Sequence, residues 1–346
     1  MNININLQVE SRKLVLNSIE LLKKQGFKFQ EYEDWKKVEV HTLENRIDLY
    51  KKNNLDITKL KEHLKESLLI ESFKTSQIFD YLDFQHRLIS KKPRTIIYSK
   101  KFLCSNELAD GLKLFERKVT QGETLFPHLS RQIFKASTQD GLLFDWGIHH
   151  FHLGTKPDKN HQHLIEGTRD VLYAMVNDNE MYFLTIGNHK DWANKRLLQI
   201  VKREFSHLID HWKIDIILEP KESLSEKQLI AFRKAGASTC IELDGDVYFS
   251  PGGGINSAGG SMRATGQFQQ ICYWYEQAEK KIVEAMEKHY SAIKNNSKNI
   301  PKEINLEGMK QYTDKITVED KSNNIKVSLA FHPESNQFGE VSIENN

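Results

Sequence analysis

Three histidines stand within four residues of an otherwise apolar run, the densest group of side chains in the chain that could do chemistry. The run is Asp145-Trp-Gly-Ile-His-His-Phe-His-Leu-Gly154, with imidazoles at His149, His150 and His152. Near pH 7 a neutral imidazole can take a proton and an imidazolium can give one. Two such groups could deprotonate a ribose 2′-hydroxyl and protonate a leaving 5′-oxygen, with an Arg or Lys stabilising the phosphorane.

The run from Asp145 to Gly154 is expected to be a strand, because its apolar and aromatic residues favour extended structure. Successive side chains of a strand point to opposite faces. We therefore expect His150 and His152 to share one face, and His149 to point the other way. A bulge at Gly147 would change this register.

The same histidines could instead bind a metal ion or make structural hydrogen bonds. His150 and His152 could both contact one ion. The remaining ligands would then come from His161, His163, His189 or Asp145. The chain has no HExxH motif, and the nearby carboxylates follow no recognised ligand spacing. We therefore expect no metal and no cofactor, with a metal-dependent hydrolase or nuclease as the alternative.

Composition indicates a globular protein with more than one folding unit. The chain has 346 residues, 39% of them hydrophobic, and a net charge of +2, which by itself does not indicate a nucleic-acid partner. Its three cysteines are far apart and lack CxxC spacing, so no disulfide framework is expected. No segment has the roughly 18 apolar residues of a membrane span, and the start does not resemble a signal peptide. We expect a cytoplasmic location and no membrane partner.

The order of elements predicts an α+β fold, with an antiparallel sheet core flanked by helices, an N-terminal helical unit and a C-terminal strand-and-helix extension. The chain is expected to have four parts. These are a helical unit (1–93), a catalytic sheet core (94–210), a hairpin with a glycine-rich loop and a long helix packed on the core (211–294), and a linker with a C-terminal hairpin tail (295–346).

Several elements have clear local signals. A hairpin is expected from 171–176 and 181–186, and Asp244-Gly245 is typical of a type I′ turn. The most periodic helix runs from Phe268 to His289. Weaker signals suggest a short helix over 128–135, a segment of mixed character over 27–40, and an exposed hairpin over 315–318 and 325–331 followed by a mobile end.

The succession of a strand, two helices, three antiparallel strands and a helix over residues 94–207 resembles the RelE/HigB-like ribonuclease toxins, a group with a barnase- and EndoU-like core. The run from Thr168 to His189 looks like the central hairpin of that family. The resemblance implies that Arg169 contacts phosphate, and that His189 and Lys190 lie where the family places basic catalytic groups. This chain differs in carrying histidines on the first of the three strands and in being far larger.

A glycine-rich segment, Ser250 to Gly266, follows a strand and precedes the long helix. Its backbone amides, the helix N-terminus and Arg263 could bind a phosphate. The segment lacks GxxxxGK[ST], however, and a tightly turning connection is the alternative explanation. Trp192 could stack on a base.

These observations lead to the prediction of a metal-independent endoribonuclease, acting as a toxin or an antiviral-defence effector. Its substrate would be RNA, and its partner an antitoxin or a regulatory protein. The expected catalytic residues are His149, His150, His152, His189 and Arg169, and the expected substrate-binding residues are Lys190, Trp192 and Arg263. A non-enzymatic nucleic-acid or protein-binding module is the second alternative.

Overall fold

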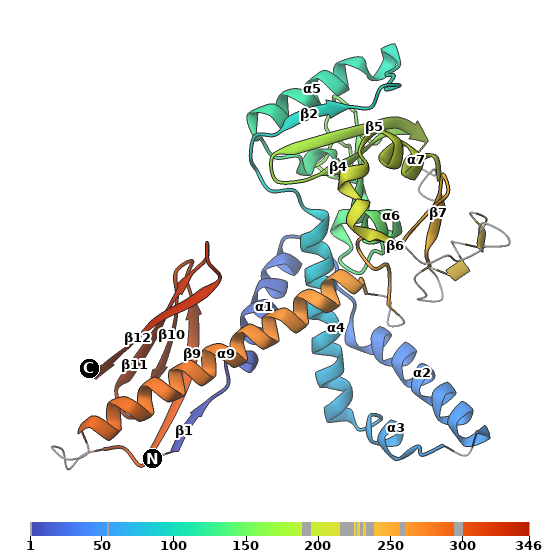
Figure 1. The fold of residues 1–346 in the computed structure, drawn as a ribbon. Helices are drawn as coiled ribbons and strands as arrows, with labels where there is room; N and C mark the ends of the chain where they lie inside the picture. Colours follow the sequence, from blue (N-terminus) through green and yellow to red (C-terminus); the bar gives the residue numbers. More distant parts are fainter. Residues whose placement is uncertain are drawn as a thin grey trace. The chain divides into compact units, whose positions relative to one another are not determined.

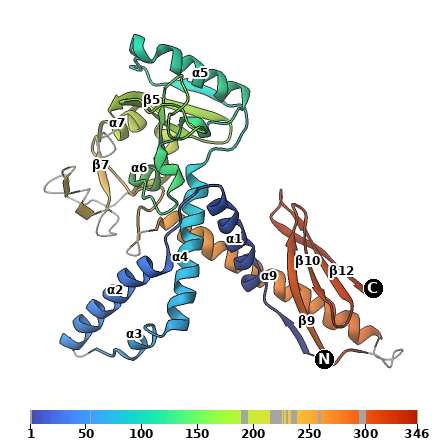
Figure 2. The same ribbon diagram turned by 180° about the vertical axis from the view of Figure 1, so that it is seen from behind.

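The computed structural model describes residues 2–53, 55–188, 195–214, 225, 227–228, 231–232, 239–256, 260–293 and 300–345. It is a mixed α/β protein whose contacts define two units (Figures 1 and 2). The terminal unit joins Met1–Leu21 to Gly266–Asn346, and the central unit is Leu22–Thr265. The four-part division expected from the sequence stays a prediction. Within the described residues, no helix combines the length and apolar character of a membrane span.

The terminal unit contains a five-stranded sheet in the order β1-β9-β10-β11-β12. The strands are β1 (Asn2–Ile5), β9 (Glu303–Gln311), β10 (Lys315–Asp320), β11 (Ile325–His332) and β12 (Gln337–Asn345). β1 pairs with β9 in parallel and the other neighbours are antiparallel, so the sheet is mixed. The expected hairpin of β10 and β11 is confirmed, but the expectation that it is exposed is wrong, because Ile316, Val318, Val327 and Leu329 are buried. The end of the chain, expected to be mobile, instead forms β12.

The long helix α9 (Met262–Ile293) confirms the helix expected over 268–289. Ala278, Ile282 and Met286 recur every four residues, are fully buried and pack against the apolar side chains of the five-stranded sheet. Leu7, at the start of α1 (Leu7–Lys24), completes this core. Residues from both ends of the chain therefore share one hydrophobic core.

The central unit contains a four-stranded sheet in the order β2-β5-β4-β3. The strands are β2 (Thr95–Tyr98), β3 (Ile148–His152), β4 (Asp170–Val176) and β5 (Glu180–Asn188). The expected hairpin of β4 and β5 is confirmed. The expectation of a purely antiparallel core is wrong, because β2 pairs with β5 in parallel. A parallel pair needs a long crossover connection, and the helices and strands between 98 and 180 provide it.

Helices cover both faces of this sheet. On one face, Phe115 of α5 (Ala109–Gln121) contacts Phe151 and Phe183, with ring centroids 4.8 and 5.9 Å away. On the other face, α7 (Lys195–Glu204) packs in a core that includes Tyr173. The sheet core therefore lies between two helical layers.

A three-stranded sheet of order β6-β8-β7 adjoins the α7 side. It consists of β6 (Lys213–Ile214), β7 (Ile241–Leu243) and β8 (Asp246–Tyr248). Asp244 and Gly245, between β7 and β8, have φ values of 50° and 86°. Two consecutive positive φ values are required by a type I′ turn, so the expected turn is confirmed.

The structure describes four further helices in the central unit: α2 (Tyr32–Lys52), α3 (Thr58–Glu62), α4 (Glu66–Arg87) and α6 (Gly141–Trp146). It also describes 3₁₀ turns at Asn106–Leu108, Phe126–His128, Arg131–Phe134, Ser206–Leu208 and Asp210–Trp212. The segment expected to be of mixed character over 27–40 contains the start of α2, which begins at Tyr32. Its apolar signal is weak, since only Leu43 and Ile47 are buried. The single helix expected over 128–135 is two 3₁₀ turns, the second capped by Ser130.

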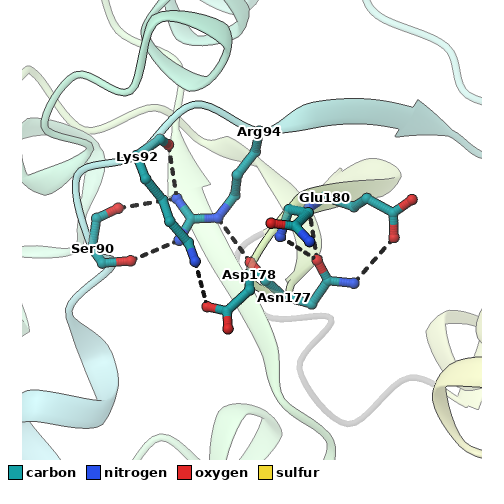
Figure 3. Close-up of polar contacts among 7 residues, drawn as sticks. Ser90, Lys92, Arg94, Asn177, Asp178 and Glu180 are labelled. Atoms are coloured by element: carbon teal, nitrogen blue, oxygen red, sulfur yellow. Dashed lines mark hydrogen bonds and ion pairs between the residues drawn. The ribbon is translucent and has the colours of Figure 1, made fainter. Parts of the chain in front are cut away.

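The turn between β4 and β5 is tied to the segment that leaves α4 (Figure 3). Arg94 is 6% exposed and donates hydrogen bonds to the carbonyl oxygen of Asn177 (2.8 Å) and to the carbonyl and hydroxyl oxygens of Ser90 (3.0 and 2.8 Å). Lys92 forms an ion pair with Asp178 at 2.6 Å. These contacts fix the hairpin to the segment that connects α4 with β2.

Candidate active site

The histidine strand is preceded by a short helix. Asp140 caps α6 by accepting a hydrogen bond from the Leu143 N–H (3.2 Å), and Gly147 ends the helix with a φ of 68°. The strand therefore begins only at Ile148, and the expectation that it starts at Asp145 is wrong. Gly147 is a helix C-cap and not a bulge.

The alternation expected for the three histidines is confirmed. β3 pairs with β4 without a break, from Ile148 opposite Met175 to His152 opposite Val171. The rings of His149 and Phe151 stack with centroids 5.8 Å apart and planes 18° apart, so these two side chains share a face. His150 consequently lies on the other face, opposite Tyr173 of β4.

His149 and His150 both line a cavity of about 340 Å³ in the central unit. The volume is at the lower end of the range typical of small-molecule sites. Polar groups come from Arg87, Ser130, Gln132, Thr138, Gln139, Asp140 and Tyr173, and apolar walls from Leu129, Ile133, Leu142 and Leu143. The cavity thus combines two imidazoles, a carboxylate and a guanidinium with an apolar surface.

Asp140 lies next to His150 in the wall of the cavity. Its Oδ2 lies 3.6 Å from His150 Nδ1, and both side chains are mostly buried. This distance is longer than a hydrogen bond, but catalytic pairs are often long without substrate and shorten when it binds. A carboxylate beside a histidine orients the ring and stabilises its protonated form. The pair is suited to proton transfer.

His149 has a different electrostatic environment. Burial lowers the pKa of His149 to about 3, and the positive charges of His150, Arg263 and Arg94 act in the same direction. The ring is therefore neutral near pH 7. A neutral imidazole can donate one hydrogen bond and accept another, so His149 can orient a ligand but is a poor proton donor.

His152, expected to be catalytic, does not line the cavity within the described part of the chain. Its Nδ1 accepts a hydrogen bond from the Thr168 N–H at 3.0 Å. Its carbonyl oxygen lies 2.8 Å from Nδ1 of the fully buried His128. These contacts join the end of β3 to the loop before β4 and to the turn at 126–128.

The other expected site residues are not gathered at the cavity. Arg169 is exposed in the loop before β4. Arg263 is exposed in the first turn of α9, where its charge acts on His149. His189, Lys190 and Trp192 lie outside the described residues.

Two residues of the site were not expected from the sequence, Asp140 and Arg87. Asp140 precedes Gly141-Leu142 as a typical helix N-cap, so a capping analysis could have identified it. Arg87 is 6% exposed and donates hydrogen bonds to the carbonyl oxygens of Gln132, Lys135 and Ala136, at 3.1, 3.0 and 2.9 Å. These acceptors are 45–49 residues away in sequence, and no local pattern indicates them.

In the glycine-rich segment, a carboxylate occupies the position expected for a phosphate. Asp83 of α4 accepts hydrogen bonds from the backbone N–H (3.0 Å) and the hydroxyl of Ser261, the residue that caps α9. A Cβ on Gly252 would lie 1.8 Å from the Phe144 carbonyl oxygen, so only glycine allows this packing against α6. These contacts with α4 and α6 explain the described residues of the glycine-rich segment without a bound phosphate.

Among the described residues, no group of three or more His, Cys, Asp or Glu side chains could hold a metal ion. The chain matches no protein-family model, and no curated protein or solved structure matches it either. The function is therefore inferred from the chemistry of the cavity.

Proposed function

We propose that the cavity is the active site of a metal-independent endoribonuclease in which His150 is the general base and Asp140 orients and stabilises its imidazole. The supporting observation is the placement of the Asp140 carboxylate 3.6 Å from His150 Nδ1 in the wall of a cavity. In this role Asp140 holds the imidazole and stabilises the charge that it gains.

The proposed reaction is an intramolecular transphosphorylation. His150 takes the proton of the ribose 2′-hydroxyl, the 2′-oxygen attacks the phosphorus, and the bond to the 5′-oxygen breaks. The leaving 5′-oxygen takes a proton from water and the protonated His150 returns its proton to solvent, which leaves a 2′,3′-cyclic phosphate and a 5′-hydroxyl. Neutral His149 donates a hydrogen bond to the phosphate, and the positive charge of Arg263 favours the anion. Leu129, Ile133 and Leu142 provide an apolar surface for a base.

The test is cleavage of an end-labelled RNA in the presence of a chelator, with the product ends identified. His150→Ala should lower the rate by about 10² or more, because general acid–base groups typically contribute 10²- to 10⁴-fold. Asp140→Asn should give a smaller loss. His163→Ala is the matched control, because His163 is exposed in a loop and should leave the rate unchanged.

Wild-type activity in folded His150→Ala protein would overturn the proposal. Activity that a chelator abolishes and a divalent metal restores would instead support the metal-dependent hydrolase or nuclease. The proposed toxin or defence role also predicts an effect on cells. Expression of the wild type should slow growth, and expression of His150→Ala should not.

A further inference from the structure

Arg87, the last residue of α4, brings a positive charge to the cavity that holds His150 and Asp140. The side chain is 6% exposed, and its three hydrogen bonds go to backbone carbonyl oxygens of the segment 132–136. These acceptors are neutral, and within the described part of the chain no carboxylate forms an ion pair with Arg87. The guanidinium charge is therefore buried beside the cavity without a counter-ion in contact.

The same hydrogen bonds fix the loop that carries Asp140. The carbonyl oxygen of Gln132 accepts a hydrogen bond from Arg87 at 3.1 Å and another from the Thr138 hydroxyl at 3.4 Å. This second bond closes the loop two residues before Asp140, which caps α6 with one carboxylate oxygen and lies 3.6 Å from His150 with the other. A short and fixed stretch of chain therefore connects Arg87 with the Asp140–His150 pair.

Carboxylates surround Arg87 at longer range. Burial lowers the pKa of its guanidinium, and three negative charges oppose this effect, in decreasing order those of Asp140, Asp83 and Asp80. Asp83 and Asp80 share a face of α4 with Arg87, because helical residues three or four positions apart are neighbours. Asp140 is thus the carboxylate that interacts most strongly with Arg87, and it is also the one beside His150.

Arg87 and a protonated His150 compete for the Asp140 carboxylate. Asp140 alone favours the protonated imidazole and so raises the pKa of His150. The charge of Arg87 opposes this rise, because it attracts the carboxylate and repels a second positive charge. A general base must be unprotonated when its substrate binds. The balance between Asp140 and Arg87 therefore decides the pH range in which His150 can accept a proton.

The other titratable groups around the imidazole supply no comparable charge inside the cavity. His149 of β3 is neutral near pH 7, and Tyr173 of β4 donates its hydroxyl proton to a backbone carbonyl oxygen. Arg94 and Arg263 add positive charge that acts on His149, but neither lines the cavity. Among the described residues of the cavity wall, Arg87 is the one permanent cation.

We propose that Arg87 is a positioning residue of the active site, whose buried charge acts through Asp140 to set the pH range in which His150 is a general base. This inference rests on the proposed function, since it assigns the group that controls the proposed base. The hydrogen bonds of Arg87 hold the cavity wall, and its charge balances the carboxylate beside the imidazole.

The experiment follows the titration of His150 by NMR in the full chain. Arg87→Met removes the charge and should raise the pKa of His150 by at least about half a pH unit. Arg87→Lys keeps the charge and should give a smaller change. The matched control is Lys135→Met, which removes an exposed charge from the same loop and should change the pKa of His150 by less than about 0.2 pH unit.

Asp140→Asn separates an effect that passes through Asp140 from direct repulsion between Arg87 and His150. Asparagine also caps helices, so α6 should persist in this variant. In the Asp140→Asn background, Arg87→Met should change the pKa of His150 by less than about half as much as it does alone. Equal changes in the two backgrounds would overturn the proposal.

The wild type provides a test that needs no folded Arg87 variant. Its Arg87 Nε resonance should shift with the midpoint of the His150 titration, because interacting charges affect each other reciprocally. A constant resonance through that range, or an unchanged pKa of His150 in folded Arg87→Met, would contradict the assigned role. With RNA as substrate, the acid limb of kcat/KM should move together with the pKa of His150. A wild type that cleaves no RNA would refute the ribonuclease function, whereas the titrations decide the electrostatic role of Arg87 by themselves.

Discussion

At the scale of single residues, Asp140 links local folding to the proposed chemistry. One carboxylate oxygen accepts the Leu143 N–H and so starts α6, and the other faces His150. A side chain already fixed by a helix cap loses little freedom when it pairs with the imidazole, which favours a preorganised site. The pair therefore depends on the start of α6 as well as on β3.

His128 should make the stability of the protein depend on pH. Burial lowers its pKa to about 4 from an unfolded value of 6.5. Below pH 6.5 the unfolded chain binds a proton at this position and the folded chain does not, so stability falls until the pH reaches about 4. Between pH 7 and pH 5 the loss from this group is about 2 kcal/mol. Urea unfolding at the two pH values measures it.

The matched variant is His128→Gln, which keeps a polar side chain but cannot titrate. This variant is expected to be less stable than the wild type at pH 7, because it replaces the ring that hydrogen-bonds to the His152 carbonyl oxygen. Its loss of stability between pH 7 and pH 5 should be smaller than that of the wild type by the amount assigned to His128. Equal losses in the two proteins would contradict the assignment.

At the scale of elements, the Arg94 contacts should determine how firmly the β4–β5 hairpin is held. Arg94→Ala removes part-buried hydrogen bonds and leaves the Asn177 carbonyl without its donor, so a destabilisation of about 2–4 kcal/mol is expected. Lys92→Ala removes an ion pair that is largely exposed and should cost less than about 1 kcal/mol. Thermal or urea unfolding of the two variants compares them directly. Similar losses of stability in the two variants would mean that Arg94 stabilises the fold no more than an exposed charged side chain does.

Elements with a local signal were predictable from the sequence. The repeated apolar positions of α9, the β4–β5 hairpin and the Asp244-Gly245 turn depend on residues that are close in the chain. The parallel pairing of β2 with β5 was missed, because it is decided by a connection of about 80 residues. Helix α2 was missed because little of its surface is apolar and buried.

The residues of the candidate site also divide into those that the sequence predicted and those that it did not. The opposite faces of His149 and His150 follow from strand geometry alone and were predicted. The contribution of Arg87 from α4 follows only from tertiary packing, since its hydrogen-bond partners lie in a turn far along the chain. His152, which does not line the cavity, accepts a hydrogen bond from the N–H of Thr168, 16 positions along the chain. Such partners have no sequence signal next to the histidines.

At the scale of the whole molecule, the core of the terminal unit should respond to a change near the N-terminus. Leu7 is fully buried among residues of α9 and β9–β11, and Leu7→Ala should destabilise this unit by about 2–5 kcal/mol. Hydrogen exchange should then speed up in β9 to β11 and stay unchanged in β3 to β5. Val9→Ala is the control, because Val9 is 44% exposed. Equal acceleration in both units would show that they unfold as one.

The pairing of β1 with β9 also sets an order of events during synthesis. Asn4 and Glu303, which hydrogen-bond across this pair, are 299 positions apart. At about 5–20 residues per second, a ribosome adds that length in roughly 15–60 s. The central unit emerges in full before β9 exists, so its cavity can form while β1 is still without its neighbour. During that interval β1 is an unpaired strand edge on a nascent chain, and its four residues, with asparagine alternating with isoleucine, limit the apolar surface that it offers to wrong partners.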